Sequence, residues 1–124
     1  MVIIQKKVML TINKEHLKAR SLEFTQGFTQ KDVQGISKLL DDNFALFDPA
    51  LKWIKGKKNV LDVLQDLFDK TKKVSYDVTN IYQDKTTSIL EFILTLDDTT
   101  LYGVDFIEWK DNRMIELRCY YNPQ

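Results

Sequence analysis

The sequence has few of the residues that usually carry metal or redox chemistry. Its 124 residues include one cysteine, Cys119, and one histidine, His16. A single cysteine cannot form an internal disulfide, which fits a reducing compartment, and protein zinc sites combine several Cys and His ligands. We therefore expect a cytoplasmic protein that holds no metal ion.

An excess of charge of one sign and a glycine-rich loop are also missing. Lys plus Arg and Asp plus Glu each number 18, so the formal net charge is zero. Such a chain has no general field that attracts nucleic acid or an anionic membrane. The four glycines form no phosphate-binding loop, and no apolar run has the length of a transmembrane helix. We expect no cofactor, no nucleic-acid partner and no membrane association.

The first half of the chain has the hydrophobic periodicity of helices. Residues 1–12 form an arm or an extra strand of unknown role, and residues 13–124 a single domain. Asn13 is a candidate N-cap for the first helix and Asp32 for a short second helix. After Gly56, apolar residues at spacings of three and four predict a third helix.

The second half has the period-two alternation of strands. A first short strand ends at Pro49, which cannot donate to a ladder, and the later strands begin at Val74. The four later strands are predicted over residues 74–83, 86–96, 99–110 and 113–121. Polar turns separate them at Asp84-Lys85, Asp97-Asp98 and Asp111-Asn112. Helices followed by such a meander are typical of an α+β domain, with the helices on one face of an antiparallel sheet.

The Asp97-Asp98 turn allows side chains to be assigned to faces. A two-residue loop places Leu90 opposite Asp105 on one face, and Ile89 opposite Phe106 on the other. Both faces are apolar, and the helices can cover only one of them. We therefore expect a homodimer that forms through the other face.

The hairpin at Asp111-Asn112 leaves two environments open for Asp105. An even loop places Asp105 opposite Arg118, and this pairing would lower the pKa of the carboxyl. An odd loop places it beside Leu117 or Cys119, where burial would raise that pKa. We favour the even loop, because loops of two or four residues suit this turn chemistry.

The order of these elements resembles the NTF2-like superfamily. The resemblance covers residues 13–121 and rests on a strand ending in FDP, a Gly-Lys pair before the third helix, and a meander that closes on a tyrosine-rich strand. It implies a cone in which three N-terminal helices pack on a curved antiparallel sheet and enclose a pocket. Members include ketosteroid isomerases, SnoaL-type polyketide cyclases, epoxide hydrolases, scytalone dehydratase, and binding or accessory domains.

The most detailed motif resemblance is to the ketosteroid isomerases. Asp48, in LFDP, stands where their catalytic base lies, and Asp105, ten residues before Ile115, stands where their neutral, proton-donating aspartate lies. Phe24 and Leu64 match the positions of two tyrosines in those enzymes. Neither side chain donates a hydrogen bond, so one oxyanion donor is missing from the matched positions.

Two functions follow as hypotheses. In the first, Asp48 and Asp105 are catalytic residues of an isomerase, cyclase or dehydratase that moves a proton on a small apolar carbonyl compound. In the second, a non-catalytic dimer binds a small apolar ligand or serves as an accessory domain. The candidate ligand-binding residues are Trp53, Arg118, Tyr120, Tyr76 and Phe24.

Each candidate residue also has a structural interpretation. Asp48 can cap backbone N–H groups before Pro49, and the aromatic residues can simply fill the core. The two hypotheses differ in whether Asp48 and Asp105 face one cavity with space between them. A cavity filled by Trp53, Phe24 and Trp109 would contradict the enzyme hypothesis.

Overall fold

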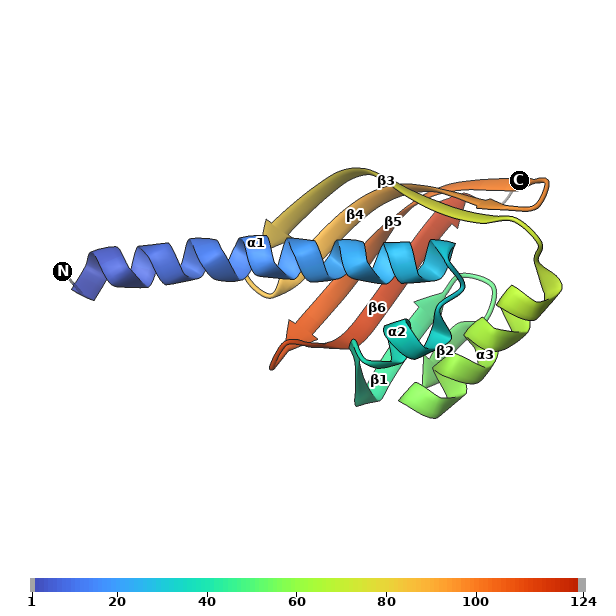
Figure 1. The fold of residues 1–124 in the computed structure, drawn as a ribbon, viewed down its shortest axis with the longest axis horizontal. Coiled ribbons are helices and arrows are strands. Elements are labelled where there is room, and N and C mark those ends of the chain that lie inside the picture. The colour runs from blue at the N-terminus through green and yellow to red at the C-terminus, as the bar shows by residue number, and fades with distance from the viewer. Residues whose placement is uncertain (1, 123–124) are drawn as a thin grey trace.

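The chain folds into an α+β domain in which three helices lie on one side of a six-stranded sheet (Figure 1). The computed structural model describes the backbone of residues 2–122 and the side chains of residues 14–122. The helices are α1 (Val2–Thr29), α2 (Val33–Ser37) and α3 (Lys57–Lys70). The strands are β1 (Leu40–Asp48), β2 (Lys52–Lys55), β3 (Val74–Asp84), β4 (Thr87–Leu96), β5 (Thr99–Lys110) and β6 (Arg113–Asn122).

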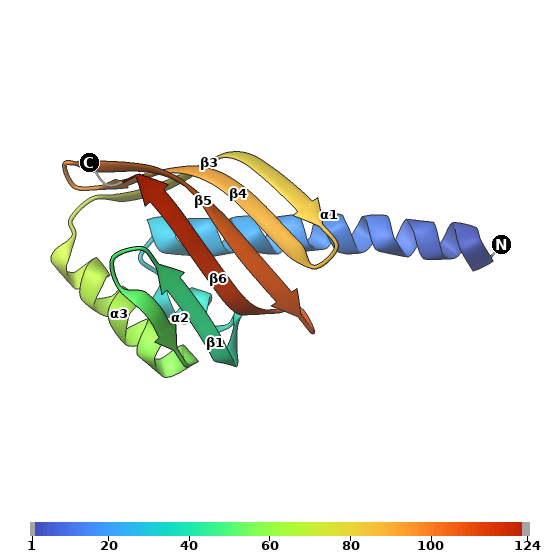
Figure 2. The ribbon, with the colours of Figure 1, turned by 180° about the vertical axis from the view of Figure 1, so that it is seen from behind.

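The strand order is β2-β1-β6-β5-β4-β3. All neighbouring pairs are antiparallel except β1 and β6, which run parallel. The sheet is curved and unclosed, and the predicted NTF2-like cone is confirmed. Figure 2 shows the opposite face of the sheet, which no helix within residues 2–122 covers. We call the helix-covered side the inner face and this side the outer face.

The first helix is longer than the sequence pattern predicts. It begins at Val2, so the predicted N-cap at Asn13 is wrong and residues 2–12 continue the helix. Its N-terminal half extends beyond the edge of the sheet (Figure 1). Its C-terminal half packs on β3, where Phe28 contacts Tyr76 with ring centroids 5.6 Å apart.

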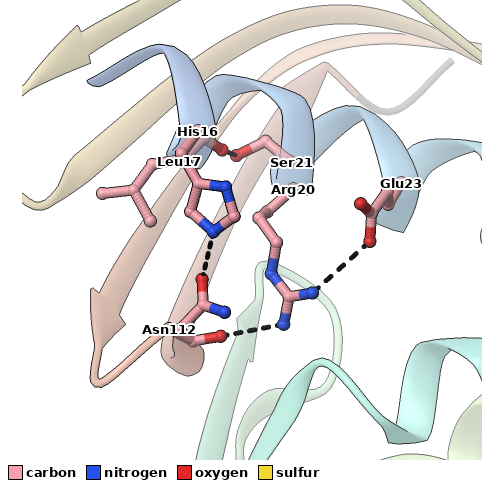
Figure 3. Close-up of polar contacts among 6 residues, drawn as sticks. All are labelled: His16, Leu17, Arg20, Ser21, Glu23 and Asn112. Atoms are coloured by element: carbon pink, nitrogen blue, oxygen red, sulfur yellow. Dashed lines mark hydrogen bonds and ion pairs between the residues drawn. The ribbon is translucent and has the colours of Figure 1, made fainter. Parts of the chain in front are cut away.

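Polar contacts join α1 to the turn between β5 and β6 (Figure 3). His16 Nε2 lies 2.7 Å from Asn112 Oδ1, and Arg20 Nη2 donates to the Asn112 carbonyl at 2.9 Å. Arg20 also lies 3.6 Å from the Glu23 carboxylate and 6.0 Å from the ring centroid of Trp109. Helix α1 is therefore held by polar contacts with the β5–β6 turn as well as by its apolar packing on β3.

The two shorter helices follow from local sequence signals. Asp32 caps α2 as predicted, because its Oδ1 accepts a hydrogen bond of 3.0 Å from the Gly35 N–H. Helix α3 buries Val60, Leu64 and Phe68, which recur every four residues on the side that faces the sheet.

The register between β4 and β5 agrees with the prediction. Leu90 pairs with Asp105 and Ile89 with Phe106, so Asp105 lies on the inner face. The turn between β3 and β4 differs by one residue: it consists of Lys85-Thr86 instead of Asp84-Lys85, because Asp84 already pairs with Thr87.

The register between β5 and β6 corrects the prediction for Asp105. The loop is even, since Lys110 pairs with Arg113, but a bulge follows it. Trp109 pairs with Met114, as an even loop requires, whereas Glu108 pairs with Glu116, so one residue of β6 is left without a partner on β5. Beyond the bulge every side chain of β6 lies on the face opposite to the one that a regular ladder would give it.

The bulge makes the predicted pairing of Asp105 with Arg118 wrong. Asp105 pairs with Cys119, and Arg118 pairs with Phe106 on the outer face. The neighbouring pairs are shifted in the same way. A ladder without the bulge would pair Ile107 with Glu116 and Gly103 with Tyr120, whereas their observed partners are Leu117 and Tyr121.

The apolar core lies between the inner face and the helices. Strand β4 shows the underlying pattern, because its side chains alternate between buried and half-buried from Ser88 to Leu94. Among the residues that the structure describes, no helix is both long enough and apolar enough to cross a membrane.

Candidate functional site

A cavity of about 730 Å³ lies between the inner face of the sheet and the helices. Its wall is mostly apolar and includes side chains from all three helices and from β1 to β6. The volume is in the range of pockets that bind small organic ligands. Its polar side chains are few: Asp48, Asp62, Asp66, Lys70, Tyr76, Asp105, Cys119 and Tyr121.

Asp105 is the buried polar centre of this cavity. Its side chain is 2% exposed, and β5 holds it on the inner face beside Leu90. The Tyr76 hydroxyl on β3 donates a hydrogen bond to Asp105 Oδ2. Asp105 Oδ1 has no hydrogen-bond partner among the described residues. A buried carboxyl oxygen without a partner is costly for folding and marks a place where a ligand can bind.

The surroundings of Asp105 favour its neutral form. Burial raises the pKa of Asp105 to about 7, the Cys119 thiol on β6 limits the rise, and the charge of Asp48 adds to it. A protonated Asp105 can accept from Tyr76 at Oδ2 and donate a proton to a ligand from Oδ1. The ion pair with Arg118 that would have kept this carboxyl charged does not form, because Arg118 lies on the other face.

Asp48 lies at the end of β1, where the chain turns toward β2. Its Oδ1 accepts hydrogen bonds from the Ala50 N–H at 2.8 Å, the Leu51 N–H at 3.0 Å and the Tyr121 hydroxyl at 3.2 Å. These three donors fix the orientation of the carboxylate. The backbone capping expected from the structural interpretation is therefore present, and the same side chain also lines the cavity.

The sheet brings the two carboxyl groups to one surface. Strands β1 and β5 flank β6, and the side chains of Asp48, Cys119 and Asp105 all line the cavity. Strands separated by one strand lie about 10 Å apart, so the backbones of the two aspartates are at about that separation, with Cys119 of β6 between them. Phe24 forms part of the cavity wall, whereas Trp53 and Trp109 do not.

The structure divides the predicted ligand-binding residues into two groups. Tyr76 and Phe24 line the cavity with the two aspartates. Trp53, Tyr120 and Arg118 do not line it. Arg118 forms an ion pair of 2.8 Å with Glu116 on its own strand, which the bulge also turns to the outer face.

Aromatic side chains gather on the outer face. Phe47 lies 5.3 Å from Trp53 and 5.6 Å from Tyr120 between ring centroids. Trp53 and Tyr120 are 45% and 46% exposed, so this group is half open to solvent. A homodimer through this face stays a prediction, and sedimentation equilibrium of the purified protein would test it.

Two polar residues of the cavity were not predicted as site residues. Tyr121 donates to Asp48, and burial raises the pKa of Tyr121 to about 12. Burial also raises the pKa of the Cys119 thiol. The sequence does contain a signal for both, because Leu117, Cys119 and Tyr121 alternate with Glu116 and Arg118.

A metal site requires several ligating side chains close together. Within the range that the structure describes, no three His, Cys, Asp or Glu side chains are grouped so that they could hold a metal ion. The arrangement can exclude water from an apolar molecule, offer a neutral acid at Asp105, and present a carboxylate at Asp48.

Comparisons with known proteins agree with the fold. Residues 22–117 match the SnoaL-like domain family. Comparison with curated proteins gives no match. Among solved structures, an NTF2-like protein of unknown function from Cytophaga hutchinsonii is 16% identical, with a TM-score of 0.76, over 86% of this chain and 90% of that chain.

Two further solved structures have names that mention an activity. A candidate ketosteroid isomerase from Kribbella flavida is 19% identical, with a TM-score of 0.79, over 90% of this chain and 82% of that chain. An LEH-like epoxide hydrolase from M. tuberculosis is 14% identical, with a TM-score of 0.78, over 89% of this chain and 85% of that chain. Identities this low establish a shared fold and leave the activity open.

Proposed function

The chain belongs to the SnoaL-like domain family and has an NTF2-like fold. We propose that it transfers a proton on a small apolar carbonyl compound bound in the cavity. Asp48 is the base and Asp105 is the acid that binds the carbonyl oxygen. The reaction belongs to the isomerase, cyclase or dehydratase type and uses no cofactor.

The observation that carries the proposal is the environment of Asp105. Its Oδ1 is buried and has no partner among the described residues, while its Oδ2 accepts from Tyr76. In the proposed reaction Asp48 removes a proton from the carbon beside the carbonyl, and negative charge develops on the carbonyl oxygen. The proton on Asp105 Oδ1 stabilises that charge, and Asp48 then returns its own proton to the substrate, so that protons balance.

Tyr76 takes part in this scheme as a positioning residue. The isomerase-like position on α1 carries Phe24, which cannot donate, but Tyr76 supplies a hydroxyl from β3. By donating to Oδ2 it orients the carboxyl so that Oδ1 is left for the ligand. The Tyr76 hydroxyl therefore compensates in part for the hydroxyl donors that Phe24 and Leu64 lack.

A non-catalytic ligand-binding role is the second candidate. It is favoured by the three hydrogen bonds at Asp48 Oδ1, which are also those of an aspartate that stabilises the turn after β1. In this case the cavity and Asp105 bind an oxygen-bearing ligand, and no proton leaves carbon.

Hydrogen–deuterium exchange at carbon distinguishes the two. The protein is mixed with β-tetralone, an enolisable bicyclic ketone, in deuterated buffer, and proton NMR follows the loss of the signal beside the carbonyl. We expect the protein to accelerate exchange and Asp48→Asn to slow it about 100-fold or more, because general base catalysis is typically of this size. The control is Asp98→Asn, which removes an exposed turn carboxylate outside the cavity.

The outcomes separate clearly. Acceleration that Asp48→Asn abolishes and Asp98→Asn preserves supports the enzyme. Binding of β-tetralone without accelerated exchange, measured by calorimetry, supports the second candidate and overturns catalysis for this class of ketone. Equal acceleration by Asp48→Asn and the unmodified protein would contradict the role of Asp48.

A further inference from the structure

The charged side chains around the cavity are strongly unbalanced in sign. Three carboxylates, those of Asp48, Asp62 and Asp66, line it beside the buried carboxyl of Asp105, together with a single cationic group, that of Lys70. The whole chain has equal numbers of acidic and basic residues. The excess of acid is therefore a local property of the cavity.

The carboxylates of α3 lie where the cavity opens to solvent. Asp62 and Asp66 are exposed and one helical turn apart, so they lie on the same side of α3. Lys70 Nζ lies 2.9 Å from Asp66 Oδ2, which leaves little of its charge for a ligand. Asp62 forms no ion pair or hydrogen bond with the described residues, and its charge faces the opening uncompensated.

The inner end of the cavity gives an independent reason to expect a ligand without a negative charge. Asp105 is 2% exposed and its Oδ1 has no partner among the described residues. No Arg, Lys or His lines that end of the cavity. A carboxylate or phosphate placed there would lose its hydration without gaining a cation, which is a large cost.

We propose that the cavity selects its ligands by charge: it accepts apolar molecules with a neutral polar group or a protonated amine and rejects those with a carboxylate or phosphate. Asp62 and Asp66 make this distinction at the opening, because Asp66 offsets the charge of Lys70 and Asp62 leaves a net negative charge there. The inference rests on the proposed function only in that a small apolar ligand occupies the cavity.

Three matched probes test the selection. Pyrenebutylamine, pyrenebutanol and pyrenebutyrate share one flat apolar body and one linker, and at neutral pH they end in a cation, a neutral hydroxyl and an anion. Pyrene fluorescence reports binding of each probe. We expect the amine to bind tightest and the carboxylate weakest, with each step about fivefold, the size of one favourable exposed ion pair. High salt should reduce the difference in affinity between the amine and the carboxylate, because it screens exposed charges.

Variants locate the selection in the structure. The double variant Asp62→Asn, Asp66→Asn leaves Lys70 unpaired, so it should reduce the difference between amine and carboxylate by at least fivefold. The matched control is Asp69→Asn, on the same helix, where Asp69 accepts a hydrogen bond of 2.9 Å from Gln65 and does not line the cavity. Ala50→Trp, at an exposed position of the cavity wall, should weaken all three probes by blocking the opening.

The results separate this inference from the proposed function. Equal binding of the three probes, or tightest binding of the carboxylate, overturns charge selection and leaves ligand binding in place. No change in the double variant overturns the role of Asp62 and Asp66. If no probe binds, or if Ala50→Trp leaves binding unchanged, the ligand cavity itself is refuted, and the proposed function and this inference fail together.

Discussion

The raised pKa of Asp105 predicts an unusual pH dependence of stability. The pKa is about 7 in the folded protein and 3.8 in an exposed aspartate, so the folded state holds this proton more tightly. Between these values the unfolded chain releases the proton first, and rising pH therefore lowers the free energy of unfolding. A difference of three pKa units corresponds to about 4 kcal/mol.

Replacing Asp105 with Asn isolates this contribution. The amide has nearly the shape of a protonated carboxyl but does not titrate. Relative to the unmodified protein, Asp105→Asn should become more stable by about 4 kcal/mol as the pH rises from about 4 to about 8. Below about pH 4 the stabilisation that the raised pKa of Asp105 gives the folded protein is fully present, and above about pH 8 it is lost.

Urea unfolding at a series of pH values measures this difference in stability. The contributions of the other carboxyl groups to the pH dependence cancel, because both proteins contain these groups. Asp98→Asn is the control, since it removes an exposed turn carboxylate, and its difference from the unmodified protein should vary by less than about 1 kcal/mol. A stability difference for Asp105→Asn that stays constant with pH would refute a neutral Asp105. A difference of opposite sign would indicate a paired carboxylate.

Three further predictions concern the pKa of Asp105, the packing of β5 against β6, and the cap of α2. Cys119→Ala removes the group that limits the shift, so carboxyl NMR titration should give Asp105 a pKa above about 7, and an unchanged or lower value would contradict that role. Gly103→Ala places a methyl group against the Tyr120 carbonyl oxygen, so urea unfolding should show that the protein is less stable by about 1–3 kcal/mol, and an unchanged stability would mean that β5 and β6 can separate there. Asp32→Ala removes the cap of α2 and should cost about 1 kcal/mol in the same assay, whereas no loss would mean that water replaces the cap.

The helices and strands were largely predictable because their signals are local. The alternation in β4 and the spacing of Val60, Leu64 and Phe68 in α3 each determine one element without reference to the rest of the chain. The start of α1 was not predictable from its cap signal. Asn13 is a good N-cap residue, but the residues before it also adopt helix, so the signal has no effect there.

The cavity includes some of the candidate site residues and leaves out others. Asp48, Asp105, Tyr76 and Phe24 line it, whereas Trp53, Tyr120 and Arg118 do not, and the catalytic and ligand-binding roles stay predictions. The misassigned residues on β6 have one physical cause, the bulge after the β5–β6 turn. Met114 and Leu117 are both buried, although an odd spacing in a regular strand would put them on opposite faces. That conflict in the sequence was the available sign of a bulge.

The sequence by itself determined that Asp105 shares a face with Leu90, because a two-residue turn sets the register of a hairpin from neighbouring residues alone. It also determined that Asp48 ends a strand, since Pro49 cannot continue the ladder. Only the tertiary structure decided which groups surround these carboxyls. The bulge turns Arg118 away and Cys119 inward, and the parallel pairing of β1 with β6 brings Asp48 to Tyr121. Because such contacts join residues far apart in the chain, the charge of Asp105 depends on the folded sheet.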